Sequence, residues 1–159
     1  MCFSPQGDLI GGAVVVAIGV DALLHLKRRF EYAPIAVLPI ALGLHEIDEV
    51  FVWWWLQGHV GRGVGMTAMW IYLLFALVVL PTLVPLLVLF LTPLSPRRWR
   101  LVPFAALGLL VSIILLEAML VGHPDVKLGA HHLAYSIGLR HGVIIIGLYI
   151  VATCGPFLA

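Results

Sequence analysis

Long apolar runs separated by short polar breaks dominate the pattern along this chain. Five runs cover residues 9–26, 33–56, 64–91, 101–121 and 128–158, and each approaches or exceeds the roughly 20 residues that a helix needs to cross a bilayer. None of them alternates between apolar and polar residues with a period of two, as the strands of a membrane barrel do. Backbone groups in hydrocarbon must be paired within the protein. The pattern therefore predicts an all-α integral membrane protein, a bundle of five transmembrane helices.

Composition supports a membrane protein over a soluble one. Of the 159 residues, 62% are hydrophobic and only 11% are charged, whereas soluble domains are about 45–50% apolar and about 25% charged. We expect a single transmembrane helical domain over residues 1–159. The net charge of +1 and the lack of a basic patch outside the loops argue against nucleic acid as a partner. Cys2 and Cys154 have neither a zinc spacing nor a disulfide framework.

Basic residues and prolines refine this picture. Lysine and arginine gather at 27–29 and 97–100, and the positive-inside rule puts these loops in the cytoplasm and the N-terminus outside. The third run has 28 residues and would be ~42 Å long as a straight helix, so Pro81 and Pro85 are expected to kink it, unless it tilts. Gly-xxx-Gly pairs at 7 and 11 and at 138 and 142 predict close helix contacts.

The second run carries the most unusual chemistry of the chain. His45, Glu46, Asp48 and Glu49 lie within five residues of its apolar sequence, although each ionised Asp at the centre of a membrane helix costs about 2.5–3.5 kcal/mol. These groups must face the protein interior, share protons, pair with cations or hold a metal. His45 and Glu49 are four residues apart on one helix face, so both side chains can converge on one ion.

Further polar residues are expected at the same depth of the bilayer. The predicted metal ligands are therefore His45, Glu49, Glu117, His131, His132 and His141, and the other members of the polar site are Glu46, Asp48, Arg140 and Tyr135. Mixed imidazole and carboxylate ligands favour zinc, iron or manganese over copper(I). A structural ion-pair network, in which Arg140 neutralises Glu49 or Asp48, is the alternative.

Three short stretches resemble an uncharacterised family of small multi-pass membrane proteins, of actinobacterial type. They are Met1-Cys2-Phe3-Ser4, the segment from His45 to Trp54, and His131-His132-x-x-Tyr135. Members of this family begin Met-Cys-Phe-Ser, and the resemblance implies a bacterial inner-membrane location without implying an activity. Cys154-Gly155-Pro156 resembles a point where such proteins continue into further helices, which implies a shorter or truncated member.

Several functions fit these residues. An intramembrane site for a divalent metal is favoured, and a metal with three protein ligands and an open water position would suit a hydrolase acting on lipid. A proton- or cation-coupled transporter of a small solute would use the acids as a relay. A haem protein with histidine ligands and a structural subunit of a larger membrane complex remain open, as does a homo-oligomer. No serine elbow, cysteine–histidine pair or nucleotide loop indicates an enzyme class.

Overall fold

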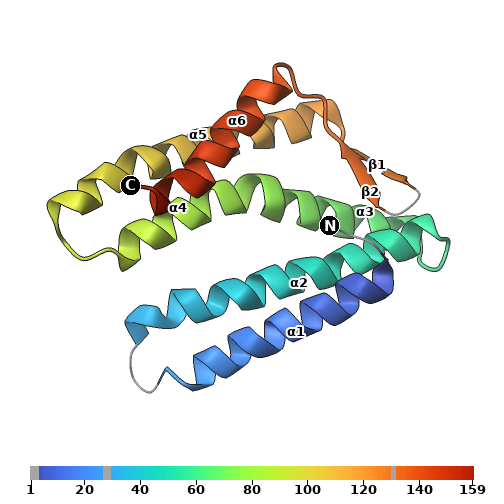
Figure 1. Ribbon diagram of the computed structural model, residues 1–159. Coiled ribbons are helices and arrows are strands. Elements are labelled where there is room, and N and C mark those ends of the chain that lie inside the picture. The colour runs from blue at the N-terminus through green and yellow to red at the C-terminus, as the bar shows by residue number, and fades with distance from the viewer. Residues whose placement is uncertain (1–3, 27–29, 130–131) are drawn as a thin grey trace. The chain divides into compact units, whose positions relative to one another are not determined.

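Helices dominate the computed structural model, which describes residues 4–26, 30–129 and 132–159 (Figure 1). In chain order the elements are α1 (Pro5–Leu24), η1 (Phe30–Tyr32), α2 (Ala33–Leu56), α3 (Arg62–Leu73), η2 (Leu74–Val79), α4 (Leu80–Leu91), α5 (Pro96–Gly122), β1 (Asp125–Leu128), β2 (Leu133–Ser136), α6 (Gly142–Cys154) and η3 (Gly155–Phe157). Because α3, η2 and α4 are continuous, the described residues form five long helical stretches, and the predicted helical character is confirmed.

Three of these stretches are long and apolar enough to cross a membrane, among the residues described: Pro5–Leu24, Arg62–Leu91 and Arg98–Gly122. Helix α2 has 24 residues but carries three acids near its middle. A shorter apolar helix covers Gly142–Phe157. Length and composition thus agree with a membrane protein.

The prediction of a helix over residues 128–158 is wrong for the first half of that range. Residues 125–128 and 133–136 form an antiparallel hairpin in which Val126 pairs with Tyr135, and α6 begins only at Gly142. The chain leaves α5 at His123, whose φ of 48° is left-handed and ends the helix. The hairpin pairs its backbone groups between strands, so an apolar composition alone could not distinguish it from a helix. Gly138 therefore precedes α6 instead of lying in the middle of a helix.

The chain divides into two compact units, which we describe separately. The first contains α1, α2, α3 as far as Tyr72, and the hairpin of β1 and β2. The second begins at Leu73 and contains η2, α4, α5 and α6. A single transmembrane domain over the whole chain stays a prediction.

In the first unit, α1 and α2 form a closely packed helical hairpin (Figure 1). A Cβ atom on Gly43 would lie 2.5 Å from the backbone oxygen of Gly12, and a Cβ on Gly12 would lie 2.6 Å from the oxygen of Gly43. About two helical turns further along α1, a Cβ on Gly19 would lie 2.9 Å from the backbone nitrogen of Ile40. The small residues in contact are thus seven apart. Gly11, from the predicted Gly-xxx-Gly pair, is exposed and faces open space.

In the second unit, hydroxyl groups bond the backbone of an irregular helix. The π-helical segment η2 directly precedes α4, in which Pro81 lacks an N–H donor. Ser112 Oγ donates to the carbonyl oxygen of Val78 at 2.6 Å, and Tyr149 Oη donates to that of Ala76 at 2.8 Å. Below them, Val111, Leu115 and Ile145 form an apolar core. A kink at Pro81 and Pro85, or a tilt, stays a prediction. The structure has a π-helical segment directly before Pro81, and two of its carbonyl oxygens accept hydrogen bonds from side chains.

Candidate functional site

The close contact between α1 and α2 brings one acid of α1 to the acids of α2. Asp8 lies in the first turn of α1, one turn before Gly12, and its side chain is buried. Across the contact, the position of a Cβ on Gly12 is 3.2 Å from Cβ of Glu46. A larger residue at position 12 would push the helices apart, so glycine is what allows Asp8 and Glu46 to approach each other.

Three carboxyl groups meet at this point. Asp8, Glu46 and Glu49 each offer an oxygen, and these oxygens all lie within 4.8 Å of one another. Glu49 is fully buried, Asp8 is 4% exposed, and Glu46 is half-buried. We call Asp8, Glu46 and Glu49 the carboxylate triad.

Two aromatic side chains donate hydrogen bonds to the triad. The indole Nε1 of Trp53 donates to Asp8 Oδ2 at 2.9 Å, and both residues are buried. The phenolic oxygen of Tyr135, on strand β2, donates to Glu49 Oε1 at 3.0 Å. Donors that bond one oxygen of a carboxylate fix its orientation and leave its other oxygen to face a ligand.

A column of stacked rings extends from Tyr135 to α2. The ring of Tyr135 stacks on that of Tyr72, with centroids 4.9 Å apart and planes 15° from parallel. Tyr72 stacks in turn on the imidazole of His45, at 4.1 Å and 15°. His45 therefore packs against Tyr72, which in turn packs against Tyr135, the residue that donates to Glu49.

The triad brings three acidic groups to one point between α1 and α2. Three ionised carboxylates this close repel one another strongly, because the Coulomb energy rises as the local dielectric constant falls. Protons or a cation among them would relieve this repulsion. An all-oxygen set of this kind suits hard divalent cations such as Mg²⁺, Ca²⁺ and Mn²⁺, since carboxylates are the ligands that these ions prefer.

Some of the residues predicted for the polar site lie close together in the structure. Glu46, Glu49 and Tyr135 lie together in the structure, and His45 joins them through the ring column. We expected His45 and Glu49 to converge on one ion. The triad contains Glu49 but not His45, and its other members are Asp8 and Glu46.

Asp48 faces a different part of the first unit. It lines an open hollow of about 380 Å³ with Phe51, Val64 and Thr67. Its buried Oδ2 atom has no hydrogen-bond partner within the described ranges. It adjoins Glu49 in the sequence but lines this hollow and is not a member of the triad.

The other predicted site residues lie elsewhere. His132 is exposed at the hairpin, and Glu117, Arg140 and His141 are exposed residues of the second unit. Arg140 was expected within a helix as a buried cation, but it precedes α6 and is exposed, because the chain is not helical there. His131 lies outside the described residues.

Asp8 is the member that sequence reasoning missed. It stands at the polar edge of the first apolar run, where an acid is an ordinary first-turn residue of a helix. The available signal was the distance from Asp8 to Gly12, one turn, together with the seven-residue step from Gly12 to Gly19 that marks the α2-facing side of α1.

Comparison with other proteins identifies a family and no characterised relative. No curated protein and no solved structure is significantly similar to this chain. One family model matches over residues 1–159, which confirms the expectation of an uncharacterised family. With its whole length matched, the chain belongs to the family of unknown function DUF6629.

Proposed function

We propose that this protein is an integral membrane protein that binds a divalent cation between Asp8, Glu46 and Glu49. The observation that carries the proposal is the meeting of three carboxyl oxygens, from two helices, within 4.8 Å of one another. Two of the three side chains are buried, and each of these two accepts a hydrogen bond from an aromatic donor. Buried ionisable groups in apolar helices are functional by default, because their desolvation is costly.

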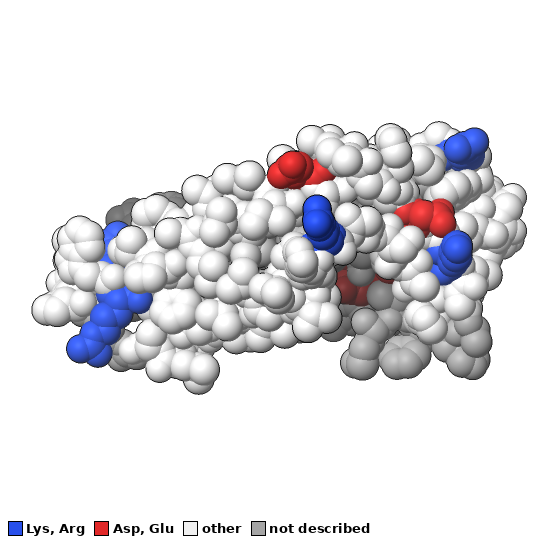
Figure 2. All heavy atoms as spheres, turned by 90° about the horizontal axis from the view of Figure 1, so that it is seen from above, with Lys and Arg blue, Asp and Glu red and all other residues white. Residues whose placement is uncertain are grey.

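The surface of the helices supports the membrane part of the proposal. Large apolar side chains are widely exposed, including Val143 at 88% and Leu24 at 76%. Figure 2 shows one face of the molecule, on which most of the described atoms belong to uncharged residues. Soluble monomers rarely expose apolar surface on this scale. The basic residues at 27–29 and 97–100 favour a cytoplasmic position for both loops, with the N-terminus outside, and the resemblance to bacterial proteins beginning Met-Cys-Phe-Ser favours the inner membrane.

Manganese is the one metal among those expected from the sequence that is also suited to a site of three carboxylate ligands. It belongs with zinc and iron among metals that accept mixed nitrogen and oxygen ligands, yet it also accepts oxygen alone. Three protein ligands leave coordination positions for water or a substrate oxygen. A hydrolytic step on lipid would use such an open position, and the protein's own contribution is to hold Asp8 and Glu49 in place through Trp53 and Tyr135.

Metal binding to the purified protein tests the proposal. We expect detergent-purified wild type to retain Mn²⁺ stoichiometrically after dialysis and Glu49→Gln to lose it with its helical circular dichroism unchanged. Outer partners of metal ligands alone change affinity by about 10–100-fold, so loss of a ligand should cost more. Glu117→Gln is the matched control, because Glu117 is exposed on α5.

Two outcomes would overturn the cation site. A folded wild type that binds none of Mn²⁺, Mg²⁺ or Ca²⁺ would indicate that protons occupy the triad, which would favour a proton-coupled transporter. Equal metal loss in Glu117→Gln and Glu49→Gln would mean that the triad is not the site.

A further inference from the structure

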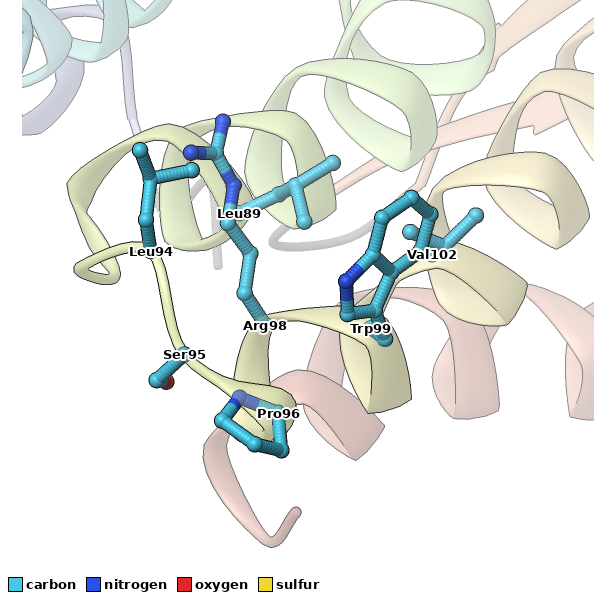
Figure 3. A pocket seen from close by; sticks show the side chains of 7 residues that line it. All are labelled: Leu89, Leu94, Ser95, Pro96, Arg98, Trp99 and Val102. Atoms are coloured by element: carbon cyan, nitrogen blue, oxygen red, sulfur yellow. The ribbon is translucent and has the colours of Figure 1, made fainter.

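A hollow lies in the second unit, between the end of α4 and the start of α5. It has a volume of about 690 Å³, within the usual range of ligand pockets. Leu89, Leu94, Val102 and the indole of Trp99 form its apolar wall, and Ser95 and Arg98 are its hydrogen-bonding side chains. Figure 3 shows Arg98 extending toward Leu94 on one side of the hollow, with Trp99 and Val102 on the other.

The segment of chain that forms the hollow carries positive charge and no acid. Between residues 88 and 107 the charged residues are Arg97, Arg98 and Arg100, and no acid occurs in this stretch. Among the residues that the structure describes, the ion pair formed is Asp21 with His25, so Arg98 faces the hollow without a carboxylate partner. A guanidinium in this state matches the shape and charge of a phosphate group.

The hollow also lies where two apolar helical stretches end. Arg62–Leu91 finishes just before it and Arg98–Gly122 begins beside it, so in a membrane it would lie at the boundary between hydrocarbon and headgroups. Leu94 is 88% exposed and Trp99 is 77% exposed. Tryptophan is enriched at this depth, and arginine extends its charge toward the headgroups from there.

We infer that this hollow binds an anionic phospholipid of the surrounding membrane, with the lipid phosphate at Arg98 and an acyl chain along the apolar wall. The positive end of the α5 dipole also favours an anion here, because α5 begins at Pro96, which lines the hollow. A free phosphate would leave Leu89, Leu94 and Trp99 uncovered. A phospholipid would cover this apolar wall with its acyl chain and would also place its phosphate at the Arg98 guanidinium. The inference rests on the membrane location proposed above and does not depend on the carboxylate triad.

Native mass spectrometry of the delipidated full chain tests this inference. The probes are phosphatidylglycerol and phosphatidylcholine with the same acyl chains, together with glycerol phosphate as a soluble anion. We expect wild type to retain phosphatidylglycerol in preference to phosphatidylcholine and to retain no glycerol phosphate. One basic residue near an anionic surface contributes about 1 kcal/mol, so Arg98→Ala should weaken retention of phosphatidylglycerol about fivefold.

Arg100→Ala provides the matched control. It removes the same charge two residues away on α5, but Arg100 does not line the hollow, so phosphatidylglycerol retention should stay near that of wild type. Arg98→Lys, which keeps the charge, should retain more lipid than Arg98→Ala and shows whether position 98 tolerates substitution.

Three results would contradict the inference. Equal losses in Arg98→Ala and Arg100→Ala would indicate non-specific attraction to basic residues. Equal retention of both lipids by wild type would remove the role of charge. Retention of glycerol phosphate as strongly as phosphatidylglycerol would identify a site for soluble phosphate. Metal content is unaffected by any of these variants if the two sites are independent, so failure here is distinguishable from failure of the cation site.

Discussion

The two units use polar side chains in opposite ways. In the first, carboxyl groups of α1 and α2 face one another, and Trp53 and Tyr135 donate to them. In the second, hydroxyl groups face the backbone: Ser112 and Tyr149 donate to carbonyls of the π-helical segment. Both arrangements satisfy buried polar atoms, yet only the first brings acidic groups together.

This difference separates structural polarity from functional polarity. The hydroxyls of the second unit have a structural role in the irregular helix. A π-helical segment before a proline leaves carbonyl oxygens without helical partners, and hydrocarbon cannot donate hydrogen bonds to them. Asp8 and Glu49 have no such role, since the helices that carry them are regular around them. A buried polar group that no backbone irregularity requires is therefore the better indicator of a ligand site in this protein.

The largest effect is expected from separating α1 and α2. Gly43→Leu would place a branched side chain against the Gly12 backbone, where even a Cβ comes within 2.5 Å of oxygen. Overpacking of this kind costs about 1–3 kcal/mol, and the upper end is expected because backbone cannot move aside. Thermal unfolding in detergent measures the loss. Gly11→Leu is the control, since nothing lies within 4 Å of that position, and equal destabilisation by both would contradict the close contact.

A smaller effect is expected from neutralising the acid of α1. Asp8→Asn keeps an oxygen for the Trp53 indole but removes one negative charge from the triad. Mn²⁺ affinity, measured by titration calorimetry, should fall by on the order of 100-fold or more, because Asp8 is a proposed ligand and even the outer partners of ligands change affinity by about 10–100-fold. Asp21→Asn changes an exposed acid on the same helix and should leave affinity unchanged. An Asp8→Asn variant with wild-type affinity would exclude Asp8 as a ligand.

The smallest effect compares the two tyrosines directly. Tyr135→Phe removes the donor to Glu49 and keeps the ring that stacks on Tyr72, so Mn²⁺ affinity should fall about tenfold. Tyr149→Phe removes a donor to the Ala76 carbonyl instead, and it should lower stability by about 1 kcal/mol without changing affinity. The contrast fails if Tyr149→Phe weakens metal binding as much as Tyr135→Phe does.

Much of the helical architecture could be predicted from sequence. Helix α2 begins and ends where its apolar run does, at Ala33 and Leu56, because hydropathy and the proline near its start agree. The hairpin formed by residues 125–128 and 133–136 escaped prediction, because the run from Leu128 to Leu158 is predominantly apolar and only the pairing of the strands distinguishes its first part. Hydropathy reports which solvent a segment prefers, and it reports secondary structure only indirectly.

The site was predictable along one helix and not between helices. Glu46 and Glu49 are conspicuous because acids are rare in apolar runs, and Tyr135 was named as a neighbour. Asp8 was not, because its approach depends on a glycine contact that sequence spacing alone did not assign to a partner helix. The histidines were predicted by residue type, and His132 and His141 are exposed, because residue type alone says nothing of where the fold places a side chain.

The bond from Trp53 to Asp8 gives the site an optical consequence. Indole emission is sensitive to charge near the ring, and the Trp53 N–H points at a carboxylate that an incoming cation would neutralise. Occupancy of the triad should therefore alter the emission of this one tryptophan. Subtracting the spectrum of a Trp53→Phe variant isolates its signal from those of the other four. The side chain that holds Asp8 in place is thus also a built-in reporter, readable without any label.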